Sequence, residues 1–154
     1  MKKYDLSSED GRQAYFDDRF AILKKYDVQI EADYNGKAFN VDSDCARFSG
    51  MSLECLKELI KNGFADPDET QNDSPDIATY GRFLEQHSKY SKLTLHGYII
   101  TPTRSDVRVS VEGIEGELGQ DDLPDFATLF RYADEFSIDT PKHFGQFTVR
   151  CWYD

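Results

Sequence analysis

Hydrophobic and polar residues alternate with a period of two in several parts of this chain, and such alternation predicts β-strands. The clearest case is residues 93–117, which we expect to form a hairpin around a polar turn at 101–106. One face of this hairpin carries the apolar side chains of Leu93, Leu95, Ile99, Val107, Val109 and Val111. The opposite face carries Thr94, His96, Tyr98, Arg108, Ser110 and Glu112.

A second hairpin is predicted around Asn35-Gly36, because this dipeptide suits the two positive φ angles of a type I′ turn. Residues 28–34 alternate before the turn, and the predicted register pairs Tyr34 with Lys37, Ala32 with Phe39 and Ile30 with Val41. The closing residues 147–153 alternate as well, which predicts one more strand.

Apolar residues at helical spacing predict four helices, at residues 7–26, 52–62, 75–90 and 122–133. Ser7 or Ser8, Ser52, Ser74 and Asp122 are the expected caps. The element order is then α-β-β-α-α-β-β-α-β. We therefore predict an α+β fold, with a largely antiparallel sheet of about five strands and about four helices in one globular domain, residues 1–154.

The chain has 154 residues, and its 29 acidic and 18 basic side chains give a formal net charge of −11. Such a surface repels phosphate on average, which argues against binding nucleic acid or anionic membranes. A basic partner would instead be attracted over a distance. An acidic surface that serves only solubility is the simpler alternative.

Three cysteines, Cys45, Cys55 and Cys151, are an odd number at spacings that fit no zinc motif. The N-terminal residues MKKYDLSSED contain no apolar signal region, and no segment has the length of a membrane helix. We expect free thiols and a cytoplasmic protein of bacterial style, and no metal or cofactor.

Five carboxylates lie in the segment 65–76, which raises the question of calcium binding. An EF-hand loop needs glycine at its sixth position and glutamate at its twelfth, where this segment has Gln71 and Ile77. A solvated loop is the better interpretation. Since no catalytic motif occurs and no local signature favours a Cys–His pair, we predict no catalytic residues.

The polar face of the hairpin is the candidate site. If the last strand joins the same sheet, it adds its own polar side chains to that face. The predicted binding residues are His96, Tyr98, Arg104, Arg108, Ser110, Glu112, Arg150 and Trp152. Trp, Tyr and Arg are enriched among binding hot spots, and a nearby Glu112 would raise the pKa of His96. A plain solvated sheet face is the competing interpretation.

Two functional hypotheses follow. The first is a non-enzymatic protein-binding or accessory protein, for example an inhibitor or immunity-type protein that blocks a basic enzyme. The alternative is a small enzyme or small-molecule-binding domain that uses the polar sheet face around His96, Arg108 and Glu112.

Overall fold

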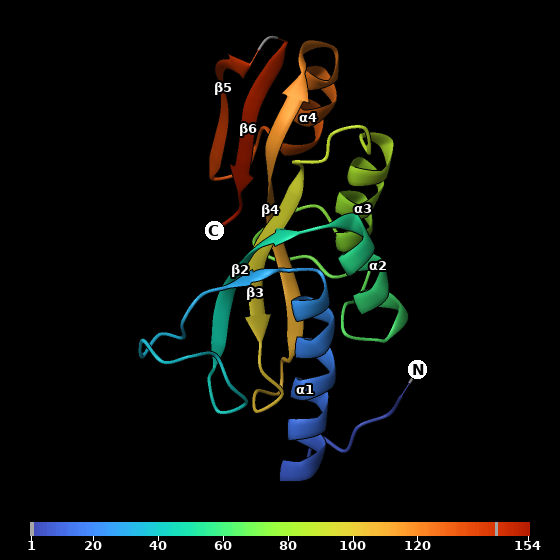
Figure 1. Ribbon diagram of the computed structural model, residues 1–154, viewed down its shortest axis with the longest axis vertical. Helices are drawn as coiled ribbons and strands as arrows, with labels where there is room; N and C mark the ends of the chain where they lie inside the picture. Colours follow the sequence, from blue (N-terminus) through green and yellow to red (C-terminus); the bar gives the residue numbers. More distant parts are fainter. Residues whose placement is uncertain (1, 144) are drawn as a thin grey trace.

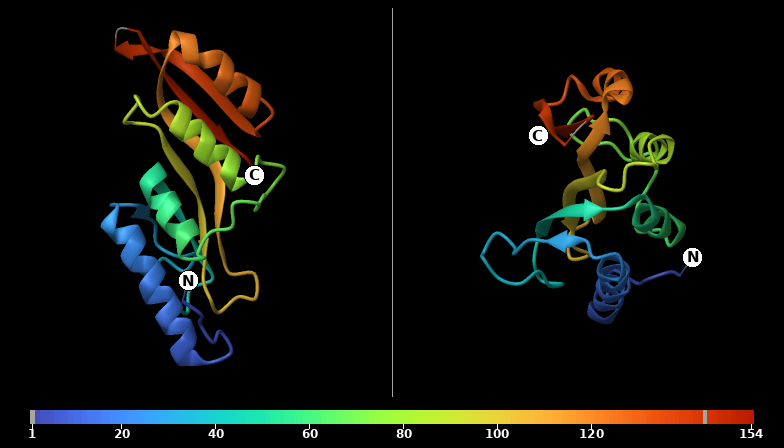
Figure 2. Two further views of the ribbon diagram at one scale, coloured as in Figure 1. Left: turned by 90° about the vertical axis from the view of Figure 1, so that its right-hand side faces the viewer. Right: turned by 45° about the horizontal axis from the view of Figure 1, so that its top comes forward.

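A computed structural model describes residues 2–143 and 145–154, and it confirms the α+β fold with four α-helices and a six-stranded antiparallel sheet. The helices are α1 (Glu9–Lys25), α2 (Leu53–Lys61), α3 (Ile77–Gln86) and α4 (Leu123–Phe130), the last preceded by a 3-10 turn, η1 (Gln120–Asp122). All four lie on one side of the sheet and leave its other side without a helix (Figure 1 and Figure 2).

The strands are β1 (Gln29–Ile30), β2 (Cys45–Met51), β3 (Thr94–Ile100), β4 (Arg108–Gly119), β5 (Glu135–His143) and β6 (Gln146–Trp152). Their spatial order is β1-β2-β3-β4-β6-β5. Strand β4 is long enough to pair with β3 over its first part and with β6 over its second. It therefore joins the two halves of the sheet.

The hairpin predicted at residues 93–117 is confirmed as β3 and β4. Leu95 is opposite Ile114 and Ile99 is opposite Val109, and all four side chains are buried in the core. The register shifts between His96 and Gly97, where Glu112 is the extra residue on β4. After this bulge the parity of β4 changes, so that Gly113 and Glu115 follow His96 and Thr94 onto the face away from the helices.

The prediction of a hairpin around Asn35-Gly36 is wrong, because residues 37–41 do not form a strand in the described part of the chain. Gly36 has a positive φ of 75° but Asn35 does not, so the turn is not of type I′. The Asp33 carboxylate accepts hydrogen bonds from the backbone N–H groups of Asn35 and Lys37 and from the Ser43 hydroxyl, which holds the segment as a compact loop. Strand β1 pairs with β2 instead.

Two strands were not predicted, β2 and β5. Strand β2 (CARFSGM) does not alternate cleanly and contains Gly50 at a φ of 72°. Strand β5 (EFSIDTPKH) is polar and includes a proline, as tolerated at the edge of a sheet.

The helix caps follow local chemistry with one correction. Ser8 and Ser52 cap α1 and α2, as predicted. Helix α3 is capped by Asp76 rather than Ser74, because its carboxylate accepts a hydrogen bond from the Thr79 N–H. Asp122 does not cap α4 through its side chain, which accepts a hydrogen bond from the Tyr90 hydroxyl.

One hydrophobic core fills the space between the helices and the sheet. Tyr80 and Phe83 of α3 pack on Phe130 of α4, and Phe126 of α4 stacks on Phe136 of β5. The three cysteines are free and buried, as expected. Within the described residues, no helix is long and apolar enough to cross a membrane.

Candidate functional site

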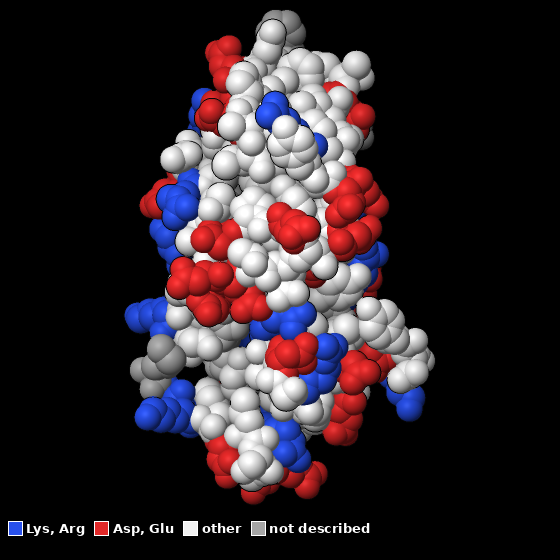
Figure 3. All heavy atoms as spheres, turned by 180° about the vertical axis from the view of Figure 1, so that it is seen from behind, with Lys and Arg blue, Asp and Glu red and all other residues white. Residues whose placement is uncertain are grey.

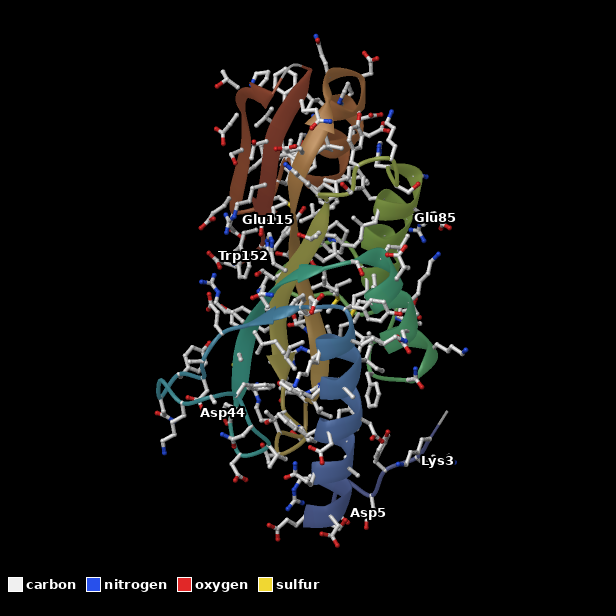
Figure 4. All side chains as sticks on the ribbon, in the orientation of Figure 1. Lys3, Asp5, Asp44, Glu85, Glu115 and Trp152 are labelled. Carbon is white, nitrogen blue, oxygen red and sulfur yellow. The ribbon has the colours of Figure 1, made fainter. Side chains whose placement is uncertain are left out.

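Trp152 and Glu115 lie on the sheet face that no helix covers (Figure 4), and Trp152 is part of a stack of side chains there. Its base is Gly113 of β4, above which lies the imidazole of His96 from β3. The indole of Trp152 from β6 stacks on this imidazole, with ring centroids 4.6 Å apart and planes 14° from parallel. The guanidinium of Arg47 from β2 lies 4.5 Å from the indole centroid. The stack therefore joins four strands.

Gly113 makes this arrangement possible. A Cβ atom at this position would lie 2.1 Å from His96 Nε2 and 2.1 Å from the Cys151 carbonyl oxygen. Because glycine has no side chain, the imidazole can cross β4 and reach β6, where Nε2 lies 2.9 Å from that carbonyl. A carbonyl oxygen only accepts hydrogen bonds, so Nε2 carries the proton and Nδ1 keeps a lone pair.

The imidazole is neutral over the physiological pH range. The pKa of His96 is lowered from 6.5 to about 4, mainly by burial and also by the nearby guanidinium groups of Arg150 and Arg47, while the hydrogen bond with the Cys151 carbonyl acts in the opposite direction. Glu115, and not Glu112, is the carboxylate next to the ring, with Oε1 3.9 Å from Nδ1. The expected rise of this pKa through Glu112 is wrong, because Glu112 is not beside the ring and desolvation outweighs the attraction of Glu135.

Trp152 is only 4% exposed although no helix covers it. Its cover consists of polar side chains: Arg47, the edge of the Tyr98 ring at 5.9 Å and Arg150 at 5.8 Å. The indole N–H donates to the Asp154 carboxylate at 2.5 Å. Long side chains can move away from an aromatic face at lower cost than a packed helix, so this tryptophan can be uncovered.

Two hollows flank the stack on the same face. The smaller, of about 140 Å³, is lined by Glu31, Arg47, Phe48, Ser49, His96, Glu115, Arg150 and Trp152. The larger, of about 410 Å³, is lined by Lys92, Thr94, Glu115, Gly116, Glu117, Ser137, Asp139, Thr148, Val149 and Arg150. Glu115 and Arg150 border both hollows. The face is therefore concave, with polar and charged walls.

The predicted site residues fall into three groups. His96, Tyr98, Arg150 and Trp152 meet in the stack. Arg104 and Arg108 lie at the hairpin turn, where both bind the Asp106 carboxylate.

Ser110 and Glu112 form the third group, beneath the loop between α2 and α3. The Glu112 carboxylate accepts hydrogen bonds from the Asn72 amide at 2.5 Å and from the Ser110 hydroxyl at 3.2 Å. Burial raises the pKa of Glu112. The eight residues thus do not make one site.

The acidic segment 65–76 covers the edge of β4 that β6 leaves unpaired. Glu69 lies 3.7 Å from Arg108, and Asn72 contacts Glu112 from the same loop.

Acidic side chains form several clusters across the middle of the molecule on the side that Figure 1 hides (Figure 3). Within the described residues, no group of three or more metal-binding side chains comes together.

Arg47, Gly113 and Glu115 belong to the site but were not among the predicted residues. Arg47 lies on a strand that the sequence pattern did not indicate, and the other two reach this face only because of the bulge at Glu112.

Comparisons with models of protein families, with curated proteins and with solved structures find no significant match. Functional inference therefore rests on the chemistry of this face.

Proposed function

We propose that this protein is a non-enzymatic binding protein whose uncovered sheet face recognises a partner protein of basic character. The observation that supports this most is the position of Trp152, on a face without helices and beneath side chains that can move. Tryptophan, tyrosine and arginine dominate binding hot spots, and here all three are gathered between two hollows.

The charge of the molecule supports a basic partner. A net charge of −11 attracts a cationic protein from a distance and raises its association rate. One version of the proposal is an inhibitor or immunity-type protein that acts in the bacterial cytoplasm by covering the basic surface of an enzyme. Three buried free thiols are in keeping with a reducing compartment.

A second candidate function is the binding of a small molecule in the larger hollow. Its volume of about 410 Å³ lies in the range of ligand sites. Such sites are mostly apolar, whereas eight of the ten residues around this hollow are polar or charged, namely Lys92, Thr94, Glu115, Glu117, Ser137, Asp139, Thr148 and Arg150. Protein binding is therefore the better supported of the two.

Affinity capture with a blocking variant tests the proposal. Thr148→Trp places a bulky side chain at the larger hollow without changing the charge. Thr128→Trp makes the same change at an exposed position of α4. We expect the wild type and Thr128→Trp to capture the same protein, Thr148→Trp to lose it, and high salt to release it. A partner held equally by both variants contradicts the use of this face, and one held equally at both salt concentrations contradicts the electrostatic attraction.

A further inference from the structure

Glu115 stands between the two hollows with its hydrogen-bonding capacity unused. Its Oε1 lies 3.9 Å from His96 Nδ1 and its Oε2 lies 3.8 Å from Arg150 Nε. Both distances exceed hydrogen-bond length, and within the described residues its carboxylate accepts no hydrogen bond. Its side chain is 40% exposed, so a partner can reach it from solvent.

The neighbouring His96 presents a second acceptor. The ring is 3% exposed and lines the smaller hollow. Its Nε2–H is used by the Cys151 carbonyl, which leaves Nδ1 as a lone pair without a partner among the described residues. Two acceptors therefore lie side by side, and among the described residues neither receives a hydrogen bond.

The surrounding charges favour a cationic donor. Lys92 is paired with Glu117, and Arg150 is paired closely with Glu135 and more distantly with Glu115. The carboxylates of Glu31 and Asp139, which also line the hollows, have no ion pair within the described part of the chain. Two cations border the smaller hollow: Arg47, whose guanidinium is stacked on Trp152, and Arg150, which already has Glu135 as its closer carboxylate.

We propose that Glu115 and Nδ1 of His96 form a subsite for a lysine or arginine side chain of the partner protein. This assignment rests on the proposed function and adds to it the side chain that the face recognises. The incoming ammonium or guanidinium group donates one hydrogen bond to the carboxylate and one to the imidazole nitrogen. It also gives a carboxylate that accepts no hydrogen bond among the described residues a charge-assisted one.

Blocked amino acids test the chemistry of the subsite without the partner. The ¹⁵N-labelled protein is titrated at neutral pH with Nα-acetyl-arginine amide, Nα-acetyl-lysine amide and the neutral Nα-acetyl-citrulline amide. We expect the two cationic compounds to shift the His96 Nδ1 resonance and the amide signals of Glu115 and Gly116, and citrulline to leave them unchanged. Equal shifts with citrulline overturn the proposal.

Substitution of the carboxylate gives a matched comparison. Glu115→Gln keeps the shape of the side chain and removes its charge, and Glu117→Gln does the same two residues along β4, at a carboxylate already paired with Lys92. We expect Glu115→Gln to weaken cation binding about tenfold, and Glu117→Gln to change it less than about twofold. Equal affinities of the wild type and Glu115→Gln overturn the proposal.

The captured partner separates this subsite from the proposed function. If Thr148→Trp abolishes partner binding and Glu115→Gln weakens it about tenfold, both are supported. If Thr148→Trp abolishes binding and Glu115→Gln has no effect, the binding face stands and the subsite is overturned. If the partner binds Thr148→Trp as well as it binds the wild type, the proposed function fails, and with it the assignment of this subsite to a partner's side chain.

Discussion

The imidazole of His96 is packed between a glycine and a tryptophan: Gly113 lies beneath the ring, and the indole of Trp152 lies against it at 4.6 Å. The two aromatic residues are 56 positions apart in the chain and come from strands on opposite sides of β4. Their contact fixes the indole on the uncovered face of the sheet. The binding surface that we propose depends on this relationship.

Gly113→Ala is expected to break the stack. The new methyl group would lie 2.1 Å from a backbone carbonyl that is held in the sheet, so the imidazole and the strand must both move. We expect the free energy of unfolding to fall by about 2–3 kcal/mol, near the upper end for overpacking in a core. Urea denaturation followed by the fluorescence of Trp152, the single tryptophan, measures this change.

Gly81→Ala is the matched control in α3. The nearest atom to a Cβ at Gly81 is Leu56 Cδ2 at 3.7 Å, an ordinary contact. We expect this variant to be more stable by about 0.5–1 kcal/mol, because alanine favours a helix over glycine. Equal effects of the two substitutions contradict the role assigned to Gly113.

His96 makes the stability depend on pH. Its pKa is about 4 in the folded protein and near 6.5 in the unfolded chain, so between these values the unfolded chain binds more protons. The stabilisation is fully present above about pH 6.5 and is lost as the pH falls to 4, up to about 3 kcal/mol in total. Denaturation at a series of pH values measures it.

His96→Asn removes the titrating ring, so its stability profile should be flatter than that of the wild type between pH 4 and 6.5. In the wild type, the imidazole signals of His96 in NMR spectra should stay those of the neutral ring down to about pH 5. Protonation near pH 6.5 in the folded protein would show that the ring is not desolvated as described.

Arg19 of α1 is buried, and no carboxylate among the described residues forms an ion pair with it. It is 1% exposed, Nη1 donates to the Arg108 carbonyl at 3.3 Å, and Nη2 has no partner among the described residues. Burial lowers the pKa of Arg19 to about 10. Because a desolvated charge is costly, we expect Arg19→Met to raise the free energy of unfolding by about 1 kcal/mol.

Urea denaturation checks this prediction, with Arg82→Met on α3 as the control. Arg82 makes one exposed hydrogen bond, to Thr79, so its replacement should change stability by less than about 0.5 kcal/mol. A large loss of stability in Arg19→Met would show that the contacts of the guanidinium with Tyr15 and the Arg108 carbonyl outweigh its desolvation.

Asn72 stabilises the loop that covers the free edge of β4. Its φ of 56° is left-handed, and its amide donates to the buried Glu112 carboxylate. Asn72→Ala loses the hydrogen bond and strains the backbone, and we expect a cost of about 2–3 kcal/mol. Asn72→Gly loses the bond without the strain and should cost about 1 kcal/mol less. Equal stabilities of the two variants contradict the backbone part of this account.

The β3–β4 hairpin could be predicted because its alternation and its core face agree with each other. The bulge at Glu112 was not predicted, although the apolar spacing changes there from two residues, up to Val111, to three, between Val111 and Ile114; which residue is extra is decided by pairing across strands. That bulge brings Gly113 and Glu115 into the site. Arg47 was missed for a similar reason, because β2 is specified by its partner strands rather than by its own pattern.

The Asn35-Gly36 hairpin shows the opposite case, where a strong local signal gives the wrong pairing. The turn is present, but the Asp33 carboxylate binds the amides on which a hairpin ladder would be built. Residues 29 and 30 then pair with β2, which offers a long neighbour within the main sheet. Tertiary pairing outweighs turn preference at this position.

Site-directed crosslinking tests most directly whether the uncovered sheet face is the binding surface. A photoreactive benzoylphenylalanine replaces Ser49, which lines the smaller hollow, or Lys57, which lies on α2 on the other side of the sheet. We predict that the probe at position 49 crosslinks one partner protein, that excess wild type competes for it, and that excess Thr148→Trp does not. Crosslinking of that partner only from position 57, or equally from both positions, would contradict the proposal.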